Sequence, residues 1–62
     1  MKINLKWRYP EEEEIHEHTF YDIDPHSMVI TCGILGFGEK DSVNKHWTIL
    51  LSHIYEMKVE ED

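Results

Sequence analysis

The chain has one cysteine in 62 residues, so no internal disulfide can hold its fold together. A domain of this length buries only about 60% of the surface that its unfolded chain exposes, which leaves a lone copy marginally stable. Small domains gain stability from disulfides, a bound metal or oligomerisation. We therefore expect one small domain over residues 1–62 that forms a homodimer or binds a partner.

Residues 2–9 give the clearest secondary-structure pattern, because apolar and polar side chains alternate there. The apolar members are Ile3, Leu5, Trp7 and Tyr9. A period of two residues predicts a strand with one buried face, and Pro10 ends it. Four consecutive glutamates follow as Glu11 to Glu14, and their mutual repulsion favours a solvated loop.

Two further strands are expected in the middle of the chain. Residues 15–24 contain β-branched and aromatic side chains, and their many charges are typical of a sheet edge. Residues 28–35 form a nearly continuous apolar run, which predicts a strand at the centre of the core, with Cys32 buried as a small hydrophobe. Residues 36–42 contain two glycines and polar side chains, so we expect a turn there.

The C-terminal third fits two patterns. As strands, its apolar residues share one face with a bend near Ser52 and His53; as a helix over about 42–58, they form a stripe. The β-branched and aromatic segment His46 to Ile49 favours two strands. We predict a mainly β fold, a small antiparallel sheet or barrel of four to five strands; the alternative is an α+β fold with a three-stranded sheet and a C-terminal helix.

Charge alternates on the first and last expected strands. The polar residues of the first strand include Lys2, Lys6 and Arg8, and those of the last strand, if it forms, are Glu56, Lys58 and Glu60. Pairing these strands would set opposite charges across from each other, which contributes about 0.2 to 1 kcal/mol per good pair. This pairing would help to close the sheet toward a small barrel.

The net charge of −7 constrains the partners. DNA, RNA and anionic lipid surfaces are bound by lysine and arginine, so we expect no direct nucleic-acid or membrane binding, but a protein partner with a basic or polar surface. The sequence has no apolar run near 18 residues, and its N-terminus alternates in polarity, which is unlike a signal peptide. These features, with the free cysteine, predict a cytoplasmic protein.

Acidic and aromatic residues supply the candidate binding surface. Between Glu11 and Asp24 the chain carries seven carboxylates and no lysine or arginine. We expect partner contacts at Glu12, Glu14, Glu17 and Asp22, with aromatic anchors at Tyr9, Phe20 and Phe37 near the ends or less covered sides of the expected elements. Trp7 and Trp47 are expected in the core. The same carboxylates also allow a nucleic-acid mimic, which would occupy the basic groove of a DNA- or RNA-acting enzyme.

Five histidines allow a metal-binding alternative. His16 and His18 are two residues apart, so both project from one face of a strand, and zinc or nickel accepts imidazole ligands. An H-x-H pair is a short motif, so no cofactor is the main expectation. Enzyme activity is not expected, because the chain has no recognisable catalytic signature and little volume for a substrate pocket.

A short acidic chain without a catalytic signature, an internal disulfide or a recognisable metal site resembles, in overall character, the small proteins of bacteriophages and other mobile elements. Many of those proteins bind and block a host protein. The resemblance implies a small acidic protein-binding module, an inhibitor of a host enzyme or defence factor that acts as a homodimer. It rests on no motif and assigns no residue.

Overall fold

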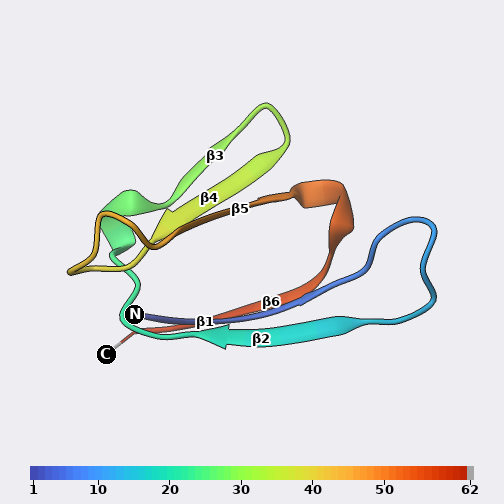
Figure 1. Cartoon of the computed structure of the whole chain (residues 1–62), viewed down its shortest axis with the longest axis horizontal. Helices are drawn as coiled ribbons and strands as arrows, with labels where there is room; N and C mark the ends of the chain where they lie inside the picture. Colours follow the sequence, from blue (N-terminus) through green and yellow to red (C-terminus); the bar gives the residue numbers. More distant parts are fainter. Residues whose placement is uncertain (62) are drawn as a thin grey trace.

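The computed structural model describes residues 1–61 and folds them into six strands and two short 3₁₀ helices. In chain order these are β1 (Lys2–Trp7), β2 (His16–Phe20), η1 (Pro25–Ser27), β3 (Val29–Thr31), β4 (Ile34–Gly38), β5 (His46–Leu50), η2 (Leu51–His53) and β6 (Ile54–Glu60). They form two antiparallel sheets, ordered β2-β1-β6 and β3-β4-β5, which face each other as two layers (Figure 1). The predicted mainly β fold is confirmed, with more strands than expected.

The first sheet confirms the pairing predicted from charge. β1 lies at its centre, between β2 and β6, and its register places Lys2 opposite Glu60 and Lys6 opposite Glu56. The corresponding ion pairs measure 2.8 and 3.4 Å between nitrogen and oxygen. Alternation along β1 points these charges outward and buries Ile3 against the other sheet.

The second sheet corrects the prediction for residues 28–35. Those residues form a hairpin rather than one strand: β3 and β4 are joined by Cys32 and Gly33, whose φ angles are 51° and 73°. Positive φ at both positions is the geometry of a type I′ turn, which matches the twist of a hairpin. Cys32 is exposed in this turn and not buried as expected. Gly36 and Gly38, predicted in a turn, lie inside β4, and the turn begins after them.

The C-terminal third confirms the two-strand interpretation and makes the helical alternative wrong. β5 and β6 are joined by η2 at Leu51–His53, where the bend was predicted. η2 carries the chain from one sheet to the other, and η1 does the same between β2 and β3. Ser27 in η1 fixes that second crossing, because its hydroxyl accepts the Gly38 N–H of β4 at 2.8 Å.

The core between the layers is small. Its buried hydrophobic residues are Met1, Ile3, Leu5, Ile23, Leu35 and Phe37. Partly buried side chains, among them Phe20 and Trp47, pack around this cluster. No helix in residues 1–61 is long and apolar enough to cross a membrane.

Candidate functional site

An open groove lies between the two sheets, beside their edge strands β2 and β5. Its volume is about 150 Å³, and it is lined by Leu5, Trp7, Tyr9, Phe20, Phe37, Trp47, Thr48 and Ile49. We call it the aromatic groove. An apolar cavity of this volume holds a group about the size of a benzene ring. The groove therefore has room for one large side chain of a partner.

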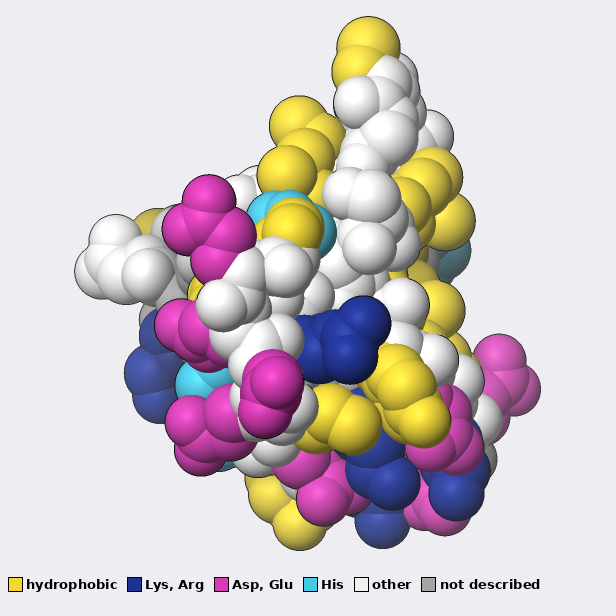
Figure 2. All heavy atoms as spheres, turned by 90° about the vertical axis from the view of Figure 1, so that its right-hand side faces the viewer, with side chains coloured by type: hydrophobic (Ala, Val, Ile, Leu, Met, Phe, Trp, Pro, Cys, Tyr) yellow, Lys and Arg dark blue, Asp and Glu magenta, His cyan; other side chains and the backbone are white. Residues whose placement is uncertain are grey.

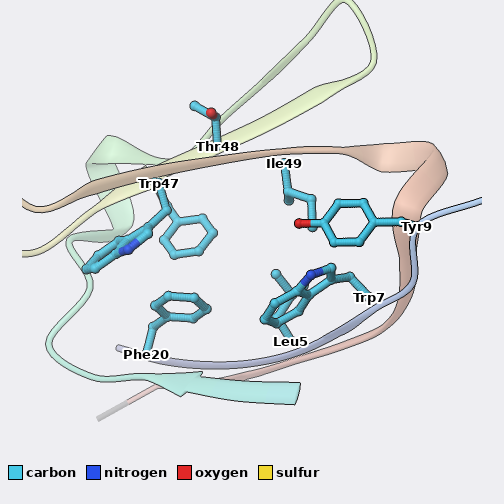
Figure 3. A pocket seen from close by; sticks show the side chains of 8 residues that line it. Leu5, Trp7, Tyr9, Phe20, Trp47, Thr48 and Ile49 are labelled. Atoms are coloured by element: carbon cyan, nitrogen blue, oxygen red, sulfur yellow. The ribbon is translucent and has the colours of Figure 1, made fainter. Parts of the chain in front are cut away.

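Two groups of rings form the walls of the aromatic groove (Figure 3). On one side Phe20 and Trp47 pack with ring centroids 4.9 Å apart. On the other side lie Trp7 and Tyr9, and both contact His16, at centroid distances of 5.6 and 5.7 Å. Leu5 and Ile49 lie beside Trp7 and Tyr9. The walls come from both sheets, so the packing of the layers sets the width of the groove.

The Trp7 wall is joined to the acidic loop that connects β1 and β2. The ring of His16 stacks on Trp7, and its Nε2 atom lies 2.9 Å from a carboxylate oxygen of Glu12. This contact brings the Glu12 charge beside the end of the groove that Tyr9 lines. Tyr9 also packs edge-on against His53 of η2, at 5.4 Å. A cation that enters the groove at this end therefore meets a carboxylate and aromatic rings together.

The other end of the groove is also acidic. A shallow extension shares Phe20 and Trp47 with the aromatic groove and continues to Asp22 and Glu39. Lys45 lines the same extension and forms an ion pair with Glu39, at 3.6 Å. Asp22 is exposed. Both ends of the groove thus carry acidic side chains.

The structure divides the residues predicted for partner binding. Tyr9, Phe20 and Phe37 all line the aromatic groove. Phe37 was expected near an element end or on a less covered side, but it is only 1% exposed and lies in the core. Glu12 and Asp22 lie at opposite ends of the groove. Glu17 points to the outer face of the first sheet, where Asn4 donates a hydrogen bond to it, and Glu14 is exposed in the loop.

Two lining residues, Trp7 and Trp47, were expected in the core and not at a binding site. Both are half-buried and present part of each indole to the groove. The alternation of polarity in the sequence predicted that both residues point inward. It did not predict that the core is too small to cover them, because the spacing of two sheets depends on all their side chains.

The histidine pair predicted for metal binding has other contacts. His16 and His18 project from the same face of β2, as expected, but His16 packs against Trp7 and Glu12, and His18 against Phe20 at 4.7 Å. Within residues 1–61 no group of three or more His, Cys, Asp or Glu side chains is arranged to hold a metal ion.

No family model matches the sequence, and comparisons with curated proteins and with solved structures found no match either.

Proposed function

We propose that this chain is a protein-binding module that holds a basic segment of a partner protein in the aromatic groove. The observation that carries the proposal is the groove itself: four large aromatic side chains, from Trp7, Tyr9, Phe20 and Trp47, stay partly exposed around one opening between the sheets. Aromatic anchors in a concave site are typical of residues that dominate protein binding.

The charge of the partner follows from the ends of the groove. Glu12 lies near one end, Asp22 lines the other beside the Glu39–Lys45 ion pair, and the whole chain carries −7. Arginine and lysine have apolar stems that pack on aliphatic side chains and charged heads that are attracted to ring faces and carboxylates. A basic segment with an arginine or lysine that enters the groove matches both properties.

Selection of peptides from a random display library on the immobilised chain tests this proposal. Enriched peptides should carry arginine or lysine, and Tyr9→Ala should weaken their binding at least about 5-fold, because truncation of a hot-spot aromatic costs more than 1 kcal/mol. Tyr9 is 43% exposed, so its loss should leave the fold intact. Tyr55→Ala, at an exposed tyrosine outside the groove, is the matched control and should bind as the wild type does. Enrichment of acidic peptides, or of peptides whose binding does not change in Tyr9→Ala, would refute the proposal.

The sharper form of the proposal is inhibition. The partner is then an enzyme or defence factor of a host, and occupancy of the groove blocks its activity. Addition of the purified chain should inhibit the captured partner, and Tyr9→Ala should lose inhibition and binding together. A partner that stays fully active when saturated with the chain would refute inhibition. The proposal that the chain is a protein-binding module would still stand.

A further inference from the structure

The charges of this chain are confined to one part of the molecule. All 13 acidic and 6 basic residues lie outside residues 28–38 and 46–55, the segments that contain β3, β4, β5 and η2. Figure 2 shows the consequence on the face that it presents. The upper part of this face is hydrophobic or uncharged, and the Asp, Glu, Lys and Arg side chains lie below it. The second sheet is thus uncharged, whereas the outer face of the first sheet carries ion pairs.

Aliphatic side chains are exposed on this uncharged part. We call four of them the hairpin surface: Val29, Ile34, Leu50 and Leu51. The register places Ile34 opposite Leu50, and Val29 shares their face of the sheet because it lies two residues before Thr31, the partner of Ile34. Ile30 is exposed too, but it lies opposite the buried Leu35 and so points to the other face. The backbone N–H of Leu51 donates to the Gly33 carbonyl at 2.8 Å, which places η2 beside the hairpin turn.

The edge of this sheet is also open. β3 is an edge strand of three residues, all of them exposed, and none carries a charge. Natural edge strands are usually protected by shortness, charged side chains, proline or a cover, because unpaired backbone groups can pair with another chain. β3 is short, but it carries neither charge nor proline. By contrast, the edge strands β2 and β6 of the first sheet contain charged residues.

From this distribution of charge and exposure we infer that two copies of the chain associate through the hairpin surface. Two molecules of charge −7 repel each other, and docking through the hairpin surface keeps their acidic segments apart. An uncharged aliphatic surface is complementary to itself, which a two-fold symmetric dimer requires. The small core of each copy gains stability from burial of these side chains, since a partner that binds only the folded state stabilises it. The aromatic groove shares no residue with the hairpin surface, so a dimer keeps both grooves.

Sedimentation equilibrium over a concentration series tests the association. The wild type should form a reversible dimer, and Val29→Glu combined with Leu50→Glu should raise its dissociation constant at least about 30-fold. Val29 and Leu50 are 53% and 44% exposed, so both substitutions should be compatible with folding. Val43→Glu is the matched control: Val43 is 98% exposed in the turn before β5 and lies outside the hairpin surface, and this variant should dimerise as the wild type does.

Salt supplies a second readout on the unmodified chain. Screening weakens the repulsion between the two acidic copies, so dimerisation should tighten between about 50 and 500 mM salt, whereas binding of a basic peptide in the groove should weaken. Failure of the two proposals is therefore distinguishable. A monomer at about 1 mM protein, or equal dimerisation of the doubly substituted variant and the Val43→Glu control, would overturn the inference.

Hydrogen exchange keeps the inference testable even where the double variant fails to fold. The amides of β3 should become more protected as the wild-type concentration rises, because association covers that strand. Protection of β3 that is independent of concentration would count against association through the hairpin surface.

Discussion

His16 stacks on Trp7, with 5.6 Å between the ring centroids and 21° between the planes. The same imidazole also contacts an acidic side chain, because its Nε2 atom lies 2.9 Å from the Glu12 carboxylate. One histidine therefore links the glutamate-rich loop to the wall of the aromatic groove. Charge and aromatic surface, separate in the sequence, meet at this contact.

Removal of the Glu12 charge should weaken a basic ligand. Glu12→Gln is expected to lower the affinity for a selected basic peptide about 2- to 5-fold, the range of an exposed charge pair, and to reduce its salt dependence. Glu17→Gln is the matched control, because it makes the same change of charge on the outer face of the first sheet. Isothermal titration at two salt concentrations measures both. Equal losses for the two variants would mean that net charge, and not position, attracts the ligand.

The turn between β3 and β4 offers a stabilising substitution. Cys32 has a φ of 51°, a conformation that asparagine tolerates better than cysteine, and Asn-Gly is the favoured pair of a type I′ hairpin. Cys32→Asn should therefore raise the free energy of unfolding by about 1 kcal/mol. Cys32→Val should lower it, because β-branched residues disfavour positive φ. Urea denaturation of both variants at one protein concentration checks the opposite signs; a destabilised Cys32→Asn would contradict the turn geometry.

Ser27 should stabilise the crossing between the sheets. Its hydroxyl accepts the N–H of the buried Gly38, so Ser27→Ala leaves that donor without its partner and should lower the free energy of unfolding by about 1 to 3 kcal/mol. Ser52→Ala, at an exposed position in η2, is the control and should change it by less than about 0.5 kcal/mol. Thermal unfolding followed by circular dichroism compares the two. Equal melting temperatures would show that the Ser27 hydroxyl contributes nothing.

The paired ends of the chain should make stability depend on acid. Lys6, by its hydrogen bond and then its charge, lowers the pKa of Glu56 below the usual 4.5, and Lys2 does the same for the pKa of Glu60. A carboxylate with a lowered folded-state pKa stabilises the fold above its unfolded value. That contribution is lost as the pH falls below about 4.5 and through the folded-state pKa.

Glu56→Gln should therefore flatten the fall in stability below pH 4.5, with little change in its slope near neutral pH. Glu13→Gln, in the exposed loop before β2, removes a carboxylate elsewhere and should keep the wild-type slope. Urea midpoints measured from pH 3 to 7, a range of about four units around the carboxyl pKa values, give the comparison. An unchanged acid slope in Glu56→Gln would contradict the contribution of this ion pair.

Alternation along residues 2–9 predicted β1, because the polarity of successive residues is a local pattern. The basic residues of β1 and the acidic residues of β6 indicated that these strands pair, and the structure has the Lys2–Glu60 and Lys6–Glu56 ion pairs. The C-terminal strands followed from β-branched residues. The β3–β4 hairpin was missed, since Cys-Gly is not a usual type I′ pair and its flanking residues, apart from Thr31, are apolar. A continuous apolar run does not show where it turns.

The site was predicted in part. The places of Tyr9 and Phe20 near the ends or less covered sides of the expected elements predicted their exposure, and both line the groove. The acidic segment predicted a contact at Glu17, but strand alternation turns Glu17 to the opposite face from His16. The roles of Trp7 and Trp47 depend on how far apart the two layers pack, which no local pattern in the sequence specifies.

The most direct measurement of the central proposal is an NMR titration of the ¹⁵N-labelled chain with a selected basic peptide. The indole N–H signals of Trp7 and Trp47 report on the two walls of the aromatic groove. Both should shift progressively and saturate together, while the backbone amide of Tyr55, outside the groove, should stay in place. Indole signals that do not move at saturating peptide, with shifts confined to the outer face of either sheet, would contradict binding in the groove.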